Sequence, residues 1–253
     1  MTGASSGIGA ATVRALRYRG WEVVGVARRA DRLEALAAET GAEVFAADLT
    51  QQADVDALAA HLAATGPLHA LAHVAGGARG ADRVEDGDPD DWTWMFEVNV
   101  LATQRVVQAL LPQLRATVDD EGGYGDLLFV TSTAAQAAYP GGSGYNAAKA
   151  GESMIVGALR LELNGEPLRI TEIAPGLVQT EEFALTRLGD AEAAAAVYAD
   201  VQDPLTAEDV ADVIAYALTV PGHVNLDLIT MRPVAQSAQH LLHRGPLRVR
   251  DAR

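Results

Sequence analysis

The sequence predicts a doubly wound α/β fold, in which a mostly parallel sheet is covered by helices on both faces. Three observations indicate this. Short apolar or β-branched runs alternate with stretches of helical periodicity along the whole chain, without internal repeats. A glycine-rich loop opens onto the first helical stretch. Residues suited to ligand binding follow the apolar runs, where the carboxyl ends of parallel strands form a binding crevice.

The expected strands are short runs rich in valine, leucine, isoleucine and alanine, as in a sheet that is buried on both faces. They cover residues 21–27, 43–47, 68–74, 126–131, 168–173 and 226–231. The expected helices have apolar residues at intervals of three and four. They cover 8–19, 32–39, 50–64, 88–114, 143–163, 191–200 and 207–218. Thr50 is expected to cap the third helix, and 119–125 is expected to be a polar surface loop.

The composition excludes several classes of function. The chain has 34 acidic and 19 basic residues and a formal net charge of −15, so no basic face for nucleic acid or an anionic membrane is expected. The absence of cysteine excludes disulfides and thiolate metal sites. No apolar run has the length of a membrane span and no signal peptide precedes the glycine loop, which favours the cytoplasm. A length of 253 residues fits one large domain over 1–253.

The glycine-rich loop is the first nine residues, MTGASSGIG. Gly3, Gly7 and Gly9 let the backbone turn tightly and approach a ligand closely. The free N–H groups and the dipole of the following helix favour a phosphate there. The spacing is not the common G-x-G-x-x-G pattern, so this loop alone is equally well interpreted as a turn before a surface helix.

Two arginines follow the first expected strand, where a dinucleotide-binding unit meets the adenosine ribose. A carboxylate at this place favours NAD, whereas an arginine accommodates the 2′-phosphate of NADP. Arg28 and Arg29 therefore predict NADP(H) as the cofactor, and the alternative is a pair of solvated surface arginines.

Tyr145 and Lys149 lie four positions apart in an expected helix and so share one face. A nearby ammonium stabilises the phenolate of a tyrosine and lowers its pKa, which suits the pair to proton transfer. Ser132, at the end of the preceding strand, is placed to hydrogen-bond the same substrate oxygen. A surface tyrosine beside a solvated lysine is the alternative. The chain otherwise uses arginine, and Lys149 is its only lysine, which favours the functional interpretation.

The motifs occur in an order that resembles the short-chain dehydrogenase/reductase family over essentially the whole chain. They are TGxxxGxG from Thr2, Ala75-Gly76, Asn99, Ser132, YxxxK from Tyr145, and PGxxxT from Pro175. The resemblance implies a Rossmann-like fold and a nicotinamide-dependent oxidoreductase in which Tyr145 is the general acid/base. It also implies that Lys149 lowers the pKa of Tyr145 and binds the nicotinamide ribose, that Ser132 holds the substrate oxygen, and that Asn99 holds a water in the proton relay.

The same resemblance implies where the cofactor lies. The pair Asp48 and Leu49 would lie along the adenine, Ala75 and Gly76 along its ribose, and Val178 and Thr180 near the nicotinamide carboxamide. The expected cofactor-binding residues are Gly3, Ser5, Ser6, Gly7, Ile8, Gly9, Arg28, Arg29, Asp48, Leu49, Ala75, Gly76, Asn99, Tyr145, Lys149, Pro175, Gly176, Val178 and Thr180. A homo-oligomer, tetramer or dimer, is implied as well.

A narrower similarity concerns the C-terminal part. The stretches APGLVQTE from Ala174, PGHVNLDL from Pro221 and RPVAQ from Arg232 resemble the NADP-dependent 3-hydroxy acid dehydrogenases, which include serine and allo-threonine dehydrogenases. A small 3-hydroxy acid is therefore the expected substrate, with 181–204 as the substrate loop and 233–253 as a tail. Arg187 is a candidate for binding a substrate carboxylate, and the alternative is that it is a surface arginine. A reductase of a larger or secondary-metabolite ketone or aldehyde, and a non-catalytic NADP-binding protein, are the alternatives.

Two departures from the family pattern stand out. His73 and Val74 stand where the family usually has two asparagines, and His73 is expected to replace some of their hydrogen bonds or to be structural. No metal site is expected, because no cluster with ligand spacing surrounds it. Only Met1 and Thr2 precede Gly3, where the family has a strand of about six residues. The first strand therefore looks truncated, and the natural protein is expected to begin upstream of Met1.

Overall fold

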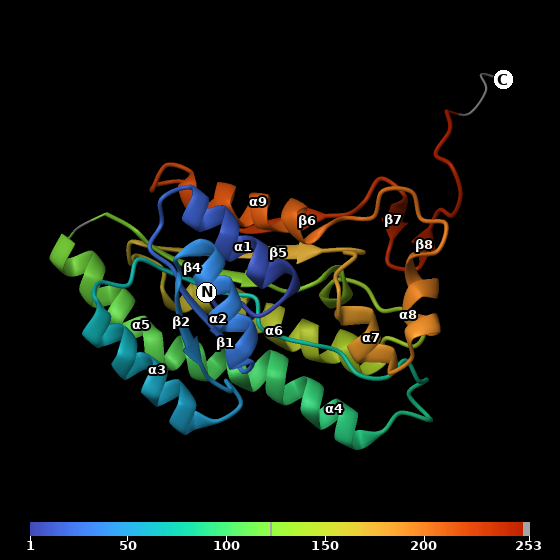
Figure 1. Cartoon of the computed structure of the whole chain (residues 1–253), viewed down its shortest axis with the longest axis horizontal. Coiled ribbons are helices and arrows are strands. Elements are labelled where there is room, and N and C mark those ends of the chain that lie inside the picture. Colours follow the sequence, from blue (N-terminus) through green and yellow to red (C-terminus); the bar gives the residue numbers. More distant parts are fainter. Residues whose placement is uncertain (122, 250–253) are drawn as a thin grey trace.

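The computed structural model describes residues 1–121 and 123–249 and consists of a parallel sheet between two layers of helices (Figure 1). The strands are β1 (Val24–Ala27), β2 (Glu43–Ala46), β3 (Ala70–His73), β4 (Gly125–Val130), β5 (Leu168–Pro175), β6 (Leu228–Met231), β7 (Gln236–Ala238) and β8 (Leu241–Leu242). The helices are α1 (Gly7–Tyr18), α2 (Ala30–Thr40), α3 (Gln52–Thr65), α4 (Pro89–Phe96), α5 (Ala102–Glu121), α6 (Ser143–Glu162), α7 (Phe183–Leu188), α8 (Ala191–Tyr198) and α9 (Ala207–Thr219). A π-helical turn, η1 (Glu97–Leu101), joins α4 to α5, and a 3₁₀ turn, η2 (Thr133–Ala135), follows β4.

The strands β1 to β6 form the parallel sheet that the sequence predicts. β2 pairs with β1, and β3, β4, β5 and β6 pair in that order, each pair in parallel register. The two groups of strands are joined through Thr2, which bridges to Val26 and donates its backbone N–H to the carbonyl of Ala72 at 3.0 Å. The residues leading into the glycine loop therefore lie at the centre of the sheet, so the loop begins at the middle of the sheet's carboxyl edge.

Two apolar cores cover the two faces of this sheet. One packs α3, α5 and α6 against one face and contains the fully buried Leu110, Leu127 and Phe129. The other packs α1, α2 and α9 against the opposite face and contains Leu33 and Ile214. In Figure 1, α1 and α9 lie above the sheet, and α3 and α5 lie below it. This arrangement confirms the predicted doubly wound α/β fold.

Several predicted boundaries are wrong. Thr50 does not cap α3, because its hydroxyl donates to Asp48 at 2.8 Å and the helix begins at Gln52. The helix expected over 88–114 is interrupted by the π-helical turn and continues to Glu121. Of the loop expected over 119–125, the first three residues are therefore helix and Gly125 begins β4, while residue 122 lies outside the described residues. Asp119 and Asp120 are exposed, and charged side chains that face solvent extend a helix without difficulty. α7 and the β7–β8 hairpin are short and were not expected.

None of the helices in the described ranges is long and apolar enough to cross a membrane.

Candidate active site

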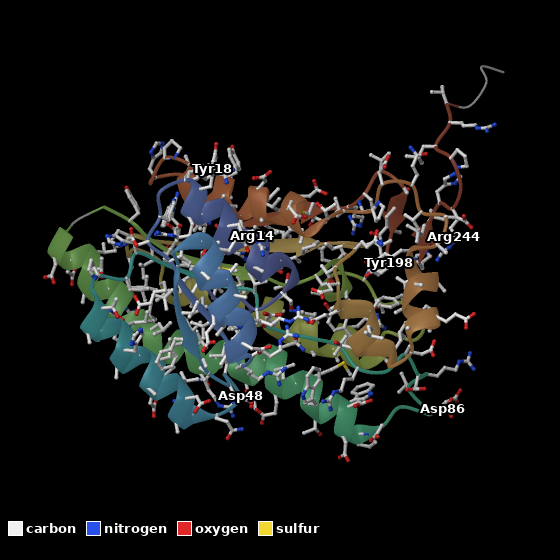
Figure 2. All side chains as sticks on the ribbon, in the orientation of Figure 1. Arg14, Tyr18, Asp48, Asp86, Tyr198 and Arg244 are labelled. Carbon is white, nitrogen blue, oxygen red and sulfur yellow. The ribbon has the colours of Figure 1, made fainter. Side chains whose placement is uncertain are left out.

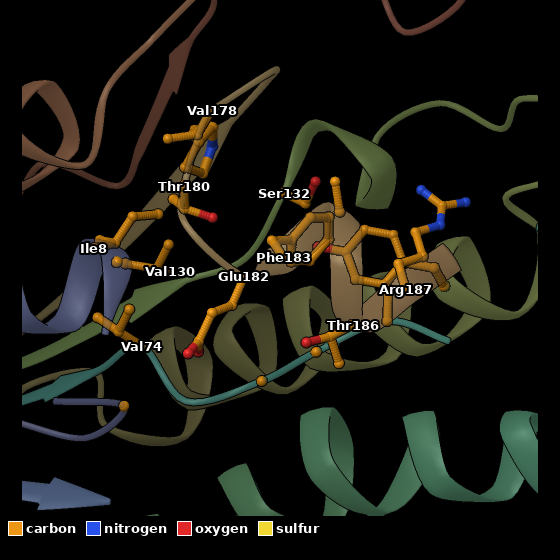
Figure 3. Close-up of a pocket in the computed structure, with 18 of the residues that line it drawn as sticks. Ile8, Val74, Val130, Ser132, Val178, Thr180, Glu182, Phe183, Thr186 and Arg187 are labelled. Atoms are coloured by element: carbon orange, nitrogen blue, oxygen red, sulfur yellow. The ribbon is translucent and has the colours of Figure 1, made fainter. Parts of the chain in front are cut away.

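A cleft of 910 Å³ runs along the carboxyl ends of the strands, from the glycine loop to α7 (Figure 3). Its size lies in the range of ligand-binding pockets. Most of the predicted site residues line it. They are Gly3, Ser5, Ser6, Gly7, Ile8, Gly9, Arg28, Arg29, Asp48, Leu49, Ala75, Gly76, Ser132, Tyr145, Pro175, Gly176, Val178 and Thr180. Asn99 and Lys149 are buried behind this surface rather than on it.

The glycine loop needs its glycines for conformation and for space. Gly3 and Gly7 have φ angles of +68° and +49°, in the left-handed region that favours glycine. A side chain at Gly9 would overlap the carbonyl group of Gly3. Ser6 is the N-cap residue of α1, but its side chain accepts no hydrogen bond from the helix backbone. The first N–H groups of the helix therefore have no side-chain acceptor at the N-cap. The helix N-terminus therefore offers an anion-binding site on the cleft.

The two arginines that follow β1 lie at the same end of the cleft. Arg28 is exposed on the lining, whereas Arg29 is held by three side chains. The Arg29 guanidinium donates to the Ser5 hydroxyl at 3.0 Å, the Ser6 hydroxyl at 2.9 Å and Glu182 at 2.6 Å. A cationic group thus lies directly beside the helix N-terminus, which is the arrangement that a phosphorylated ligand requires.

Tyr145 lies at the middle of the cleft, near the start of α6, and only 8% of it is exposed. It hydrogen-bonds Ser132, and its ring meets Phe183 edge to face at 5.7 Å between centroids. Burial raises the pKa of the Tyr145 phenol above its ordinary value, and the charge of Lys149 and the Ser132 hydrogen bond oppose this. The phenol is therefore a proton donor whose acidity depends on its neighbours.

Lys149 lies one helical turn after Tyr145 and is almost completely buried. Its ammonium donates to Glu152 at 2.6 Å and to the carbonyl of Val130 at 3.3 Å. Burial opposes the charged form, but Glu152 and Tyr145 outweigh it and hold the pKa of Lys149 above its usual value. A Cβ on Gly76 would lie 3.1 Å from this ammonium, so Lys149 reaches the back wall of the cleft.

Asn99 lies in the π-helical turn η1, an irregularity that occurs frequently at functional sites. Its side-chain oxygen accepts from the Gly77 N–H, and its amide nitrogen donates to the carbonyls of Gly77 and Met95. Its backbone carbonyl accepts from the Thr103 hydroxyl at 2.7 Å. Both amide hydrogens of the side chain are used within the protein, so Asn99 fixes the loop after β3 behind the cleft.

Comparison with known proteins decides the family. A model described as short chain dehydrogenase matches residues 1–214. The chain belongs to this family. It is 48% identical over 249 residues to an uncharacterized oxidoreductase of Mycobacterium tuberculosis (strain ATCC 25618 / H37Rv), covering 98% of this chain and 95% of the relative. It is 36% identical over 241 residues to a serine 3-dehydrogenase of Agrobacterium fabrum (strain C58 / ATCC 33970), with 94% of each chain covered.

A solved structure resembles the fold over nearly its full length. It is described as the closed form of serine dehydrogenase complexed with NADP⁺. The TM-score is 0.85 at 32% identity, and 96% of this chain and 98% of that one are covered. The resemblance to short-chain dehydrogenases and to their 3-hydroxy acid branch is thus confirmed.

His73 is one point at which this short chain dehydrogenase departs from the family pattern. The ring is fully buried, and its Nδ1 is hydrogen-bonded to the Thr2 hydroxyl at 3.1 Å. The Thr2 oxygen also accepts the N–H groups of Val74 and Ala75, at 3.0 and 3.1 Å. The Thr2 proton therefore points to Nδ1, and the ring carries its own proton on Nε2, which has no partner in the described part of the chain. His73 is a neutral structural link between the loop and β3.

The far end of the cleft contains a further cation, Arg187. In Figure 3, Ser132 and Phe183 lie between Glu182 on one side and Arg187 on the other. Arg187 donates to the hydroxyl of Tyr139 at 2.9 Å and to the carbonyls of Gly141 and Gly80 at 2.7 and 3.2 Å. Its guanidinium carbon lies 5.8 Å from the centroid of the Tyr145 ring. An anionic group held there would lie beside the tyrosine.

Sequence reasoning missed residues that reach the cleft from distant segments. They are Tyr139, Glu182, Phe183, Gln236 and Gln239. Gln236 accepts from the Leu177 N–H at 2.8 Å, and Gln239 accepts from the Thr133 hydroxyl, so the tail closes one side of the cleft. It also missed Glu152, although its spacing of three from Lys149 on a helix is a detectable signal.

Among the described residues, no group of three or more His, Cys, Asp or Glu side chains is arranged to hold a metal ion.

Proposed function

We propose that this short chain dehydrogenase is an NADP(H)-dependent oxidoreductase that interconverts a small 3-hydroxy acid and its carbonyl compound. The observation that carries the proposal is the position of Tyr145. It is buried in a cleft whose one end presents Arg28, Arg29 and a helix N-terminus, and whose other end presents Arg187. A phenol that can exchange a proton thus lies between a site for phosphates and a site for a substrate anion.

The residues at the first end fit the proposed cofactor. The N–H groups at the start of α1 suit the pyrophosphate, because a helix N-terminus favours anions. Arg28 and Arg29 suit the 2′-phosphate, because a guanidinium binds phosphate through paired hydrogen bonds. When bound, the nicotinamide supplies or accepts the hydride.

The protein's part of the reaction is the movement of one proton and the orientation of the substrate. In reduction, Tyr145 donates its phenolic proton to the carbonyl oxygen, and in oxidation the phenolate accepts the proton of the alcohol. Ser132, hydrogen-bonded to Tyr145, would hold the same oxygen. The Lys149 ammonium stabilises the phenolate, since its charge opposes the rise in pKa that burial causes.

Arg187 supports a carboxylate as part of the substrate. Each of its three nitrogens makes one hydrogen bond to the protein. A guanidinium has five N–H groups, so two remain for a ligand. In 3-hydroxy acids the carboxylate is two carbons from the reacting carbon, and Arg187 lies within a few ångströms of Tyr145. The similarity to a serine 3-dehydrogenase supports the same substrate class.

A larger ketone or aldehyde is a second candidate, favoured by the apolar lining at this end of the cleft. Tyr139, Phe183, Leu188 and Leu242 all contribute to it. Such a lining stabilises an extended apolar substrate, because burying apolar area contributes about 25 cal/mol per Å².

The whole chain is proposed to act as one dinucleotide-binding unit, with the segment 181–204 and the tail from 233 shaping the substrate pocket.

A homo-oligomer is proposed as well. On α6, Met154 is 73% exposed and Leu161 is 81% exposed, and exposed apolar side chains of this kind favour association with another copy. Sedimentation velocity over a concentration series measures the oligomeric state.

One experiment tests the function. Purified protein is supplied with NADP⁺ and serine, allo-threonine or other 3-hydroxy acids, and with alcohols of the same size that lack the carboxylate. A second set of assays supplies NADPH and larger ketones or aldehydes. We expect turnover with the acids, and a loss of roughly 10²- to 10⁴-fold in Tyr145→Phe, which retains NADPH binding as measured by fluorescence. Turnover only with larger carbonyls would favour the second candidate. NADPH binding without turnover on any compound would indicate a non-catalytic binding protein.

A further inference from the structure

A carboxylate lies behind the Tyr145 and Lys149 pair. Glu152 has no exposed surface, and its Oε2 accepts from the Lys149 ammonium at 2.6 Å. Its other oxygen, Oε1, lies 3.5 Å from the Thr103 hydroxyl oxygen, whose hydrogen goes to the Asn99 carbonyl. A buried carboxylate is costly unless it is paired, and Lys149 is the cation that pairs with it. The pair forms because positions three apart on α6 share a face.

The pairing determines where the ammonium points. Of its three N–H groups, one donates to Glu152 and one to the Val130 carbonyl. The third remains for the side of the cleft, where Gly76 leaves the space in front of the ammonium open. Without the carboxylate, the flexible four-carbon chain of Lys149 would lose the partner that holds it.

We propose that Glu152 is a positioning residue that holds the Lys149 ammonium at the back of the cleft, and that its negative charge behind the pair raises the pH at which Tyr145 ionises. It touches neither the substrate nor the reacting atoms. The inference rests on the proposed function, in which Tyr145 exchanges the proton.

The other charged or titratable groups around the pair come from several elements. His73 on β3 stays neutral, because burial and the neighbouring charges lower its pKa to about 3. Glu172 on β5 accepts from the Thr131 hydroxyl at 2.7 Å and lies 3.8 Å from Arg160. Two further side chains face Tyr145 from the other side, namely Tyr139 and Arg187. Glu152 is therefore the carboxylate that bonds directly to the Lys149 ammonium.

The direction of its effect follows from charge. A carboxylate near the phenol disfavours phenolate and raises the pKa of Tyr145, although by less than burial does. It also stabilises the ammonium of Lys149 against burial. In Glu152→Gln the negative charge is removed while the amide oxygen still accepts from the Lys149 ammonium. The repulsion on the phenolate is lost, so the phenol ionises at lower pH.

The test is a spectroscopic titration of tyrosinate absorbance on the protein without cofactor or substrate, with the Tyr145→Phe titration subtracted to isolate Tyr145. We expect the midpoint of Glu152→Gln to lie roughly 0.5 to 1 pH unit below that of the parent. Because no turnover is needed, the titration tests Glu152 even if the substrate screen fails. Circular dichroism over the same pH range confirms that each variant is folded.

Glu172→Gln is the matched control, since this carboxylate is also buried but does not bond to Lys149. We expect its midpoint to shift by less than half as much. An unchanged midpoint in Glu152→Gln, or an equal shift in Glu172→Gln, would overturn the proposal.

If Glu152→Gln does not fold, Glu152→Asp replaces it. That variant withdraws the carboxylate by one methylene, and we expect a smaller shift in the same direction, whereas no shift would overturn the proposal.

Discussion

Arg29 and Glu182 form an ion pair across the cleft, with 2.6 Å between Nη1 and Oε1, although they lie 153 positions apart in the chain. The same carboxylate lies 3.1 Å from Arg32, and Glu181 pairs with Arg32 as well. The segment after β5 is thus tied to the loop after β1. This contact holds the start of α7 over the cleft, beside the proposed phosphate site.

Glu182→Gln is expected to strengthen NADPH binding by about 3- to 10-fold. The carboxylate competes with the 2′-phosphate for Arg29 and repels it, and a half-exposed ion pair is weak enough to be displaced. Fluorescence titration at low and high salt measures the dissociation constants. Glu192→Gln, an exposed acid on α8, is the control for the change in net charge. Weaker NADPH binding in Glu182→Gln would show that the pair helps to hold the cofactor.

Arg29→Ala is expected to weaken NADPH binding by roughly 10- to 100-fold and to leave NADH binding unchanged. The lost interactions are charge-assisted hydrogen bonds to the 2′-phosphate, which contribute about 1.5 to 3 kcal/mol. Arg14→Ala is the matched control, because Arg14 lies on the outer side of α1, paired with Glu39 (Figure 2). Equal losses for NADPH and NADH would mean that Arg29 acts on the shape of the loop rather than on the phosphate.

Arg187→Gln is expected to raise KM for 3-hydroxy acids by about 10- to 100-fold, because a charge-assisted bond to the carboxylate is lost. Alcohols of the same size without a carboxylate should keep their KM. Steady-state kinetics on both substrate sets measures the difference, and Arg187→Lys should recover part of the affinity. A parallel loss on charged and uncharged substrates would instead assign Arg187 to the packing of Tyr139.

His73→Asn is expected to make stability less dependent on pH. Burial, followed by Lys149 and the terminal amine, lowers the pKa of His73 to about 3, whereas an unfolded histidine titrates near its usual value of about 6.5. The contribution of His73 is therefore fully present above pH 6.5 and is lost as the pH falls toward 3. Urea unfolding should show the parent losing up to about 1.4 kcal/mol per pH unit more than the variant in that window. Parallel slopes would show that His73 takes up a proton in the folded protein.

Local patterns were enough for the fold class and for the centre of the site. Alternating strands and helices predict the parallel sheet. In such a sheet the carboxyl ends of the strands lie at one edge, independently of the conformation of the loops. The spacing of Tyr145 and Lys149 places both on one side of a helix, and the structure has them there on α6.

The boundaries that failed are those set by packing or by competing hydrogen bonds. Thr50 has the right side chain for a cap, yet its hydroxyl donates a hydrogen bond to Asp48 instead. The π-helical turn at Asn99 was not predicted, because the apolar residues alone do not show where the backbone hydrogen bonds change to the i→i+5 pattern.

A contact of the C-terminal tail could not be predicted from the sequence either. Arg244 donates to three carbonyls at the C-terminal end of α8, those of Ala196, Val197 and the C-cap residue Ala199. Figure 2 shows Arg244 near Tyr198 at the same end of the molecule. A basic side chain stabilises a helix C-terminus, but nothing in the sequence says which helix it will reach.

The sequence by itself determined the fold, the family and the pair proposed to transfer the proton, because these depend on spacings of a few residues along one chain. Only the tertiary structure decided what surrounds that pair. Glu152 is an ordinary helical glutamate until Thr103 and the sheet bury it, and Glu182 becomes a partner of Arg29 only when segments 153 positions apart meet. Burial and long-range contact set the strength of a charge, and neither can be read from local periodicity.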